Sequence, residues 1–230
     1  MKLWIPIGAL AIYFIANQKR GLMINKNQLD NIKSFVKSKY NLDFKNYTIV
    51  GIRGGEIQNG KVIPIPNIRN QFNDILAIIK GDKVLAYKGN LEPGNPSLVK
   101  PINPEGTFQL SDGLYKVRKT THGRDIFKNG KKVRIREKAF NIVNPKGLRD
   151  KNRDKNFDSQ DPTHSLNPNH GINIHPTNRK NPKTVDHSSY GCLNLQAYWE
   201  DATWEEFRDT LYNDEINEWN LIVFDSKKII

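Results

Sequence analysis

Hydrophobic residues recur with two different periods along this chain of 230 residues. Between residues 27 and 40 the apolar side chains are three or four positions apart, a spacing that predicts an amphipathic helix. Beyond residue 45 the pattern changes to short runs, mostly rich in β-branched and aromatic residues, that end at Gly, Pro, Asn or Asp. The clearest runs are YTIVGIRG, DILAIIKGDKVLAYKG, GLYKVRK, KKVRIREKAFNIV, GINIH and WNLIVFD. We therefore predict a mostly β fold of the α+β class, a sandwich or barrel with peripheral helices.

Local signals place several boundaries of these elements. The segment KGDK, residues 80–83, lies between two strand-like runs and predicts a hairpin turn. TWEEFRDTLY predicts a helix that begins with a capping box, because Thr203 is followed three residues later by Glu206. Residues 144–185 are rich in Pro and Asn, so we expect long loops there, and such loops often carry functional sites.

The amino-terminal segment, residues 1–21, has a composition of its own. Residues 3–16 are uncharged and mostly apolar, and as a helix they measure about 21 Å, short of the ~30 Å hydrocarbon layer. Such a segment suits an uncleaved export signal or membrane anchor, or a helix that packs against a partner in an assembly such as a virion. We expect three parts: this short apolar helix, a helical stalk over residues 22–44, and a catalytic domain over residues 45–230.

Charge narrows the choice of partner only slightly. The chain has 36 Lys and Arg against 24 Asp and Glu, a net charge of +12 and a pI near 9.6. This balance favours polyanions such as nucleic acid, anionic lipid or a cell wall. The basic residues are scattered and form no compact block interleaved with aromatic residues, so nucleic acid is a disfavoured partner.

The chain contains one cysteine, Cys192, which excludes an internal disulfide. It is therefore a buried hydrophobe, an intermolecular link or a reactive thiol, and a reactive thiol needs a base. His175 lies seventeen residues upstream, where INIHPTN predicts a strand that ends at the histidine. Gly191 allows close approach of a substrate carbonyl, and the amides of Tyr190, Gly191 and Cys192 are candidate donors to an oxyanion. The residues alone leave two interpretations open: a catalytic pair, with Cys192 as nucleophile and His175 as base, or a buried structural cysteine next to a surface histidine.

Two segments contain residue types that bind metal ions. His164, His170, His175 and His187 precede Cys192 closely, but their spacing matches no zinc pattern. The segment DKNRDKNFDSQD resembles a calcium loop, with oxygen-bearing side chains at positions 1, 3, 5, 9 and 12. These residues are Asp150, Asn152, Asp154, Asp158 and Asp161. Lys155 replaces the usual glycine and no flanking helix pair is evident, so a solvated loop is the alternative to a structural Ca²⁺. No cofactor is required by the predicted chemistry.

Two motifs together resemble a known family. IHPTN, residues 174–178, and SYGCLN, residues 189–194, are similar to the histidine strand and the Ser-His-Gly-Cys-hydrophobic-Arg motif of the L,D-transpeptidase catalytic domain, the YkuD-like family. Upstream, residues 74–94 resemble its opening hairpin and LSDGLYKV its Pro-x-Gly-x-Tyr strand. The resemblance covers roughly residues 45–225 and points to divergent members of bacteriophage and Bacteroidetes-type genomes.

The resemblance implies an L,D-transpeptidase-like β fold and an enzyme that acts on peptidoglycan stem peptides. Cys192 would form a thioester acyl-enzyme, which an amine resolves in transpeptidation and water resolves in carboxypeptidase or endopeptidase action. Ser189, or a backbone carbonyl near Thr177, is the expected orienting partner of His175. The implied location faces the cell envelope, by anchoring or export, or is a virion, with membrane or virion contact through residues 3–16.

Three positions depart from the family pattern. Pro176 replaces a glycine, Tyr190 a histidine and Asn194 the substrate-binding arginine. Tyr190 still offers a hydroxyl, but Asn194 cannot form a bidentate ion pair with a carboxylate. Arg53 is a weak candidate to replace that arginine. These departures keep an alternative open, a catalytically weak or inactive structural protein of the virion or cell wall that binds peptidoglycan.

Overall fold

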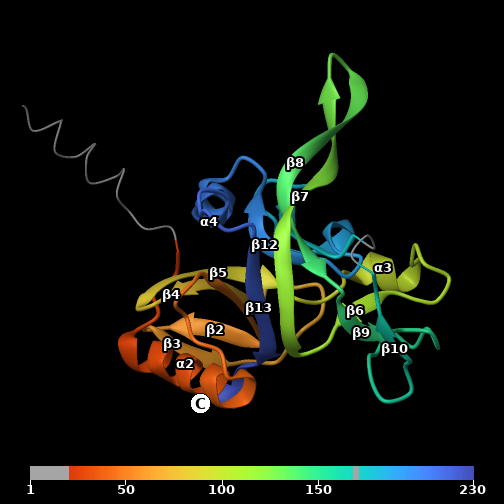
Figure 1. Ribbon diagram of the computed structural model, residues 1–230. Coiled ribbons are helices and arrows are strands. Elements are labelled where there is room, and N and C mark those ends of the chain that lie inside the picture. The colour runs from red at the N-terminus through yellow and green to blue at the C-terminus, as the bar shows by residue number, and fades with distance from the viewer. Residues whose placement is uncertain (1–20, 168–170) are drawn as a thin grey trace, which may run out of the picture.

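The computed structural model describes residues 21–167 and 171–230 (Figure 1). The predicted apolar segment, residues 3–16, lies outside the described residues. In chain order the helices and strands are α2 (Lys26–Tyr40), β1 (Thr48–Arg53), β2 (Gly55–Gln58), β3 (Lys61–Pro64), β4 (Asp74–Lys80), β5 (Lys83–Asn90), α3 (Asn95–Val99), β6 (Phe108–Leu110), β7 (Gly113–Lys128), β8 (Lys131–Val143), β9 (Lys146–Arg149), β10 (Thr163–Ser165), β11 (Asn173–Thr177), β12 (Leu193–Tyr198), α4 (Ala202–Tyr212) and β13 (Glu218–Asp225). Two short 3-10 helices are η1 (Asp186–Ser188) and η2 (Ser226–Ile229).

Eight strands close into a barrel in the order β1-β13-β7-β8-β11-β12-β5-β4. The pairs β1–β13 and β11–β12 are parallel, and the other neighbours in the barrel are antiparallel. A small sheet, β10-β9-β6, and the hairpin β2-β3 lie outside the barrel. The turn predicted at residues 80–83 joins β4 to β5, with Gly81 at a positive φ of 58°. The prediction of a mostly β fold is confirmed.

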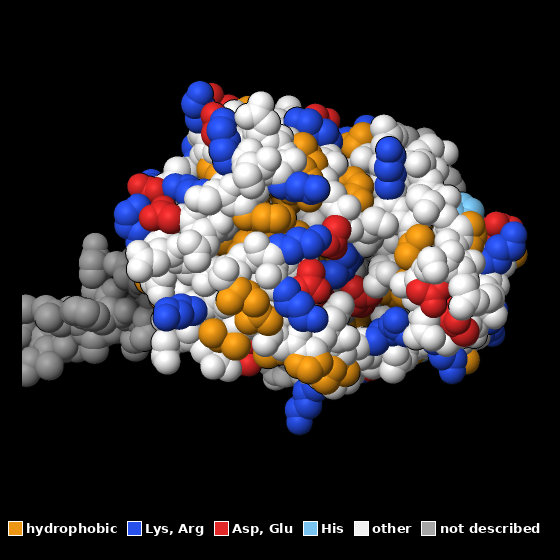
Figure 2. Space-filling view, turned by 90° about the horizontal axis from the view of Figure 1, so that it is seen from below, with side chains coloured by type: hydrophobic (Ala, Val, Ile, Leu, Met, Phe, Trp, Pro, Cys, Tyr) orange, Lys and Arg blue, Asp and Glu red, His pale blue; other side chains and the backbone are white. Residues whose placement is uncertain are grey.

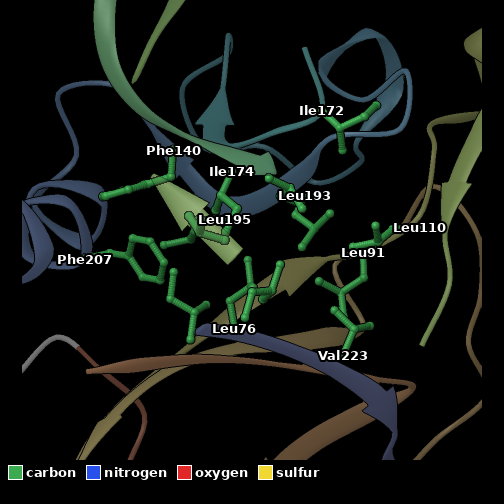
Figure 3. Packing of buried hydrophobic residues seen from close by; sticks show 14 of the residues in the cluster. Leu76, Leu91, Leu110, Phe140, Ile172, Ile174, Leu193, Leu195, Phe207 and Val223 are labelled. Atoms are coloured by element: carbon green, nitrogen blue, oxygen red, sulfur yellow. The ribbon is translucent and has the colours of Figure 1, made fainter. Parts of the chain in front are cut away.

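The barrel core is built from the alternate residues of its strands. Ile174 of β11 and Leu193 and Leu195 of β12 are fully buried and face Leu76 and Val223 from the opposite wall (Figure 3). Because successive strand residues point to opposite faces, the residues between them lie on the outside of this wall. This alternation places His175 and Asn194 on a face that other elements cover.

Helix α2 packs on the lower part of the barrel (Figure 1). Leu29, Ile32 and Val36 are buried in a second apolar cluster together with residues of β1, β4 and β13. The side chain of Gln28 donates to the carbonyl of Ile229 at 3.2 Å. The helix predicted over residues 27–40 is thus present, but it is part of the packed fold and does not form a separate stalk. Within the described ranges, no helix is long and apolar enough to span a membrane.

Helix α4 covers another side of the barrel through Trp204, Phe207 and Leu211. Its N-cap residue is Asp201, and the helix makes no side-chain capping hydrogen bond there. The predicted capping box, with Thr203 at the N-cap, is therefore wrong. Asp201 Oδ2 instead accepts from the amide of Tyr198 at 2.6 Å, which fixes the turn that leads from β12 into the helix.

Strands β7 and β8 continue beyond the barrel as a long hairpin that projects from the molecule (Figure 1). Residues 113–143 contain ten Lys or Arg and two acidic residues, so this hairpin carries a net charge of +8 out of the chain's +12. On the face away from the hairpin tip, basic side chains are interspersed with acidic ones (Figure 2). Most of the net positive charge thus belongs to one contiguous segment, and the fold extends that segment as a hairpin.

Candidate active site

The parallel pairing of β11 with β12 brings the two predicted catalytic residues to one face of the barrel. His175 is opposite Asn194, and Ile174 is opposite Leu193, so Cys192 lies next to Asn173 at the start of the pair. Parallel neighbours are about 4.8 Å apart with a rise of about 3.3 Å per residue, which separates the Cα atoms of Cys192 and His175 by about 8 Å. Ile174 and Leu193 face the core, so Cys192 and His175 share the outer face.

A cavity of about 620 Å³ lies over this face. Its lining includes His175 and Cys192 from the barrel wall, His122 from the hairpin, Arg149 from the small sheet and Tyr190 from the turn before β12. The volume suits a small ligand or a short peptide segment. Elements far apart in the sequence thus bring Cys192, His175 and cationic side chains to one pocket.

His175 is held in one tautomer by the strand that carries it. Its side chain is 1% exposed, and Nδ1 lies 2.6 Å from the carbonyl oxygen of Pro176. A carbonyl only accepts, so Nδ1 carries the proton and Nε2 is the unprotonated nitrogen. The expected orienting carbonyl near Thr177 is therefore that of Pro176. The histidine lies within β11, which continues to Thr177, so the prediction that the strand ends at His175 is wrong.

Two aromatic rings pack parallel to the His175 ring, one on its face and one beside it. The ring of His122 stacks on it with centroids 4.0 Å apart, and Trp199 lies parallel to it at 5.8 Å. Burial lowers the pKa of His175 well below its usual value, and the neighbouring His122 lowers it further against the opposing hydrogen bond to Pro176. Burial likewise lowers the pKa of His122 to about 4, helped by Arg134 and Arg136. Both imidazoles are neutral near pH 7.

Asn194 takes part in this arrangement and does not line the pocket. It is fully buried, and its amide nitrogen donates to the carbonyl of His175 at 3.2 Å. The same nitrogen lies 3.4 Å from Nδ1 and 3.5 Å from Nε2 of the imidazole. These contacts assign Asn194 to positioning His175. The structure does not bring it to the place where the resemblance expects a substrate-binding residue.

Cys192 is 8% exposed and its thiol is neutral at rest. Burial raises the pKa of the thiol to about 11, against a hydrogen bond from the amide of Asn173 that lowers it. The Sγ–H donates to the carbonyl of Gly171 at 3.4 Å. Among the described residues, no hydrogen bond joins Sγ to His175. Both residues therefore border one pocket, while the thiol donates its hydrogen bond to a backbone carbonyl and not to His175.

The turn before Cys192 is shaped by Ser189 and Gly191. The Ser189 hydroxyl donates to the Cys192 carbonyl at 2.7 Å and accepts from the Gly191 amide at 3.2 Å, so it does not orient His175. Gly191 has a φ of 120°, and a Cβ there would lie 2.7 Å from the carbonyl oxygen of Phe108. Only glycine fits this backbone. The Tyr190 hydroxyl lies 3.0 Å from His187 Nδ1 and borders the pocket.

Two further predicted residues have structural partners. The hydroxyl of Thr177 donates to the carbonyls of Arg179 and Ala197, at 2.8 and 2.9 Å. Arg53 is 8% exposed and does not border the pocket. It pairs with Glu92 at 2.9 Å and Asp112 at 2.7 Å, and also donates to the carbonyl of Leu110. All three of its nitrogens are thus used by the protein.

The polar side chains of the acidic loop at residues 150–161 mostly form hydrogen bonds within the loop. In the described ranges, no group of three or more His, Cys, Asp or Glu side chains is placed to hold a metal ion. Asn152, Asp154 and Asp158 accept hydrogen bonds from backbone amides of their own loop, at 2.7–3.1 Å. Asp150 and Asp161 are buried, and each has one carboxylate oxygen without a hydrogen-bond partner. The calcium site stays a prediction.

The sequence analysis did not predict that a second histidine and several arginines would line the pocket. His122, Arg124 and Arg134 reach it because the β7–β8 hairpin folds over β11, and Arg149 reaches it from the small sheet. Each is separated by many residues from the motif around Cys192, so no local spacing identifies them. No family model, curated protein or solved structure matches the chain.

Proposed function

We propose that this protein is a cysteine-dependent enzyme that acts on peptidoglycan stem peptides through a thioester acyl-enzyme, as an L,D-transpeptidase or an L,D-peptidase. The observation that carries the proposal is that Cys192 and His175 share the outer face of two paired parallel strands and border the same pocket. The motif resemblance supplies the substrate class. The location facing the cell envelope, or in a virion, belongs to the same proposal.

In the proposed acylation step, Cys192 Sγ attacks the carbonyl of the donor peptide and its proton passes to His175 Nε2. Nε2 is the unprotonated nitrogen, because Nδ1 carries a proton and donates it to the Pro176 carbonyl. The C–N bond of the donor then breaks, and the imidazolium returns the proton to the leaving amine. An acceptor amine or water next attacks the thioester and releases the thiol, with His175 again moving the proton.

The thiol has to turn from the Gly171 carbonyl towards His175 for this transfer. Catalytic hydrogen bonds are often long before substrate binds and shorten in the complex, so the resting contact of Sγ is compatible with the step. The Gly191 amide is occupied by Ser189, which leaves the Cys192 amide and the Tyr190 hydroxyl as the proposed donors to the oxyanion.

One observation favours the second candidate, a virion or cell-wall protein that binds peptidoglycan without turnover. The resting thiol is neutral, 8% exposed and hydrogen-bonded to a carbonyl, which is typical of an unreactive cysteine. Such a protein would retain the pocket and its cationic wall. The two candidates differ in one product, the thioester on Cys192.

Intact-mass spectrometry tests the proposal directly. The protein is incubated with purified disaccharide tetrapeptide muropeptides and with a carbapenem, and both the protein and the muropeptides are analysed. We expect an acyl adduct on the wild-type protein and either cross-linked or shortened muropeptides. Cys192→Ala is expected to abolish the adduct, and His175→Gln to slow its formation by about 10²–10⁴-fold.

His164→Gln is the matched histidine control, because His164 lies in β10 and does not border the pocket. It should acylate at the wild-type rate. A protein that binds muropeptides yet forms no adduct at any time point is the binding protein of the second candidate. Labelling that survives Cys192→Ala removes the nucleophile assignment.

A further inference from the structure

The pocket contains an arginine whose charge the protein does not neutralise. Arg149, at the end of β9, is 6% exposed and borders the pocket together with Cys192. Its Nη1 donates to the Gly106 carbonyl at 2.6 Å, and its guanidinium lies over the Phe108 ring at 5.6 Å. In the described part of the chain, no acidic side chain lies within 4.0 Å of it.

Among the described residues, the lack of an acidic partner distinguishes Arg149 from the other arginines of the pocket. Arg124 is paired with Glu137 at 3.0 Å and with Glu200, and Arg134 is paired with Asp125 at 3.3 Å. Burial of a cation is costly unless an anion or several hydrogen bonds compensate for it. Accordingly, burial lowers the pKa of Arg149, and only the more distant charge of Glu105 opposes this effect.

The guanidinium is also close to the nucleophile in the fold. Phe108 pairs with Arg149 across the β6–β9 ladder, and the Phe108 carbonyl presses against Gly191, the residue before Cys192. Arg149 and Cys192 are therefore linked through two intervening residues, Phe108 and Gly191. Because both residues line the same pocket, a ligand bound there can contact Cys192 and Arg149 together.

We propose that Arg149 binds a carboxylate of the acyl donor and thereby selects donors with a free acid near the reacting carbonyl. This inference rests on the function proposed above and adds the substrate-recognition residue to it. Planar guanidinium groups bind carboxylates through two parallel hydrogen bonds, which fixes orientation as well as affinity. The positive hairpin beside the pocket attracts the same class of ligand at longer range.

Arg149 would take the role of the substrate-binding arginine that the resemblance expects at the position of Asn194. Asn194 contacts His175 and Arg53 is held by Glu92 and Asp112, so neither is free to take a ligand. A role for Arg149 could not be predicted from the sequence, because this residue precedes the acidic loop and belongs to no part of the cysteine motif. Only the pairing of β9 with β6 brings it to the pocket.

Calorimetric titration of the Cys192→Ala protein tests this without any turnover. One ligand is a stem tetrapeptide with free carboxylates, and the other is the same peptide with those carboxylates amidated. We expect the free acid to bind more tightly by about tenfold to a hundredfold, the usual range for a charge-assisted hydrogen bond. Adding Arg149→Gln should remove this preference and leave binding of the amidated peptide unchanged.

Arg118→Gln is the matched control, since Arg118 is exposed on β7 and does not border this pocket. It should keep the preference for the free acid. Arg149→Lys retains the charge without the paired geometry and should retain part of the preference. If Arg149→Gln does not fold, the assignment is tested by titrating both peptides into Cys192→Ala and into the same protein with Arg149→Lys. A preference for the free acid that is the same in both proteins would then overturn it.

Equal affinity for the two peptides, no binding of either, or an unchanged preference in Arg149→Gln each overturns the assignment. Failure of the proposed function looks different. In that case the wild-type protein forms no thioester with the free acid, although the titration still shows the preference that depends on Arg149.

Discussion

Alkylation of Cys192 by iodoacetamide is expected to accelerate about tenfold per pH unit from about pH 7 to about pH 10, without a plateau near neutral pH. The thiolate is the reacting species, and burial raises the pKa of this thiol from 9.0 to about 11. At pH 7 the thiolate fraction is then about one in 10⁴, roughly a hundredfold lower than for a cysteine whose pKa is unshifted.

The assay is simple because Cys192 is the chain's one cysteine, so the adduct mass reports on it alone. Initial rates are measured by intact-mass spectrometry across the pH range, and the protein unfolded in guanidinium serves as the reference. In the unfolded chain the curve should move about two pH units lower, to the ordinary range of a cysteine.

His175→Gln separates this neutral resting pair from an ion pair. Because the pKa of His175 lies well below its usual value, the imidazole is already neutral throughout the range and cannot stabilise a thiolate. The alkylation curve of the variant should therefore match that of the wild type, although acylation by the donor peptide is slowed by about 10²–10⁴-fold. A plateau through neutral pH that disappears in His175→Gln would refute this reasoning, because it would reveal a thiolate–imidazolium pair.

Three further predictions concern the turn, the buried network and the acidic loop. Gly191→Ala places a Cβ 2.7 Å from the Phe108 carbonyl oxygen, at a φ of 120°. We therefore expect the rate of adduct formation in the mass assay to fall at least tenfold. An unchanged rate would show that the turn adapts. Arg53→Met leaves the carboxylate of Glu92 buried without its cation and should lower the free energy of unfolding by about 3–5 kcal/mol in urea titrations; a loss below about 1 kcal/mol would contradict this. The polar side chains of the loop at residues 150–161 mostly form hydrogen bonds within the loop, so we expect the same melting temperature in EDTA and in excess Ca²⁺; a rise with Ca²⁺ would show that the ion draws the loop together.

Much of the fold could be predicted from local pattern. The two apolar runs in residues 74–90 and the turn residues between them indicate the β4–β5 hairpin, and the spacing of Leu29, Ile32 and Val36 indicates a helix with one buried face. The capping prediction at Thr203 failed because a neighbouring Asp201 competes for the same role, and local spacing alone does not rank the two. The helix predicted as a stalk has an apolar stripe that needs a surface to cover, and the barrel provides it.

The residues of the proposed chemistry could be identified before folding was considered, because a lone cysteine after glycine and a histidine in a strand-like run are visible in the chain order. Their surroundings depend on strand pairing. The pairing of β11 with β12 gives Cys192 and His175 a common face, and the β7–β8 hairpin lays His122 on the imidazole. The β6–β9 pairing brings Arg149 to the same pocket. The physical reason is that side-chain pKa values and unpaired charges depend on burial and on neighbours distant in the chain, and strand pairing sets both.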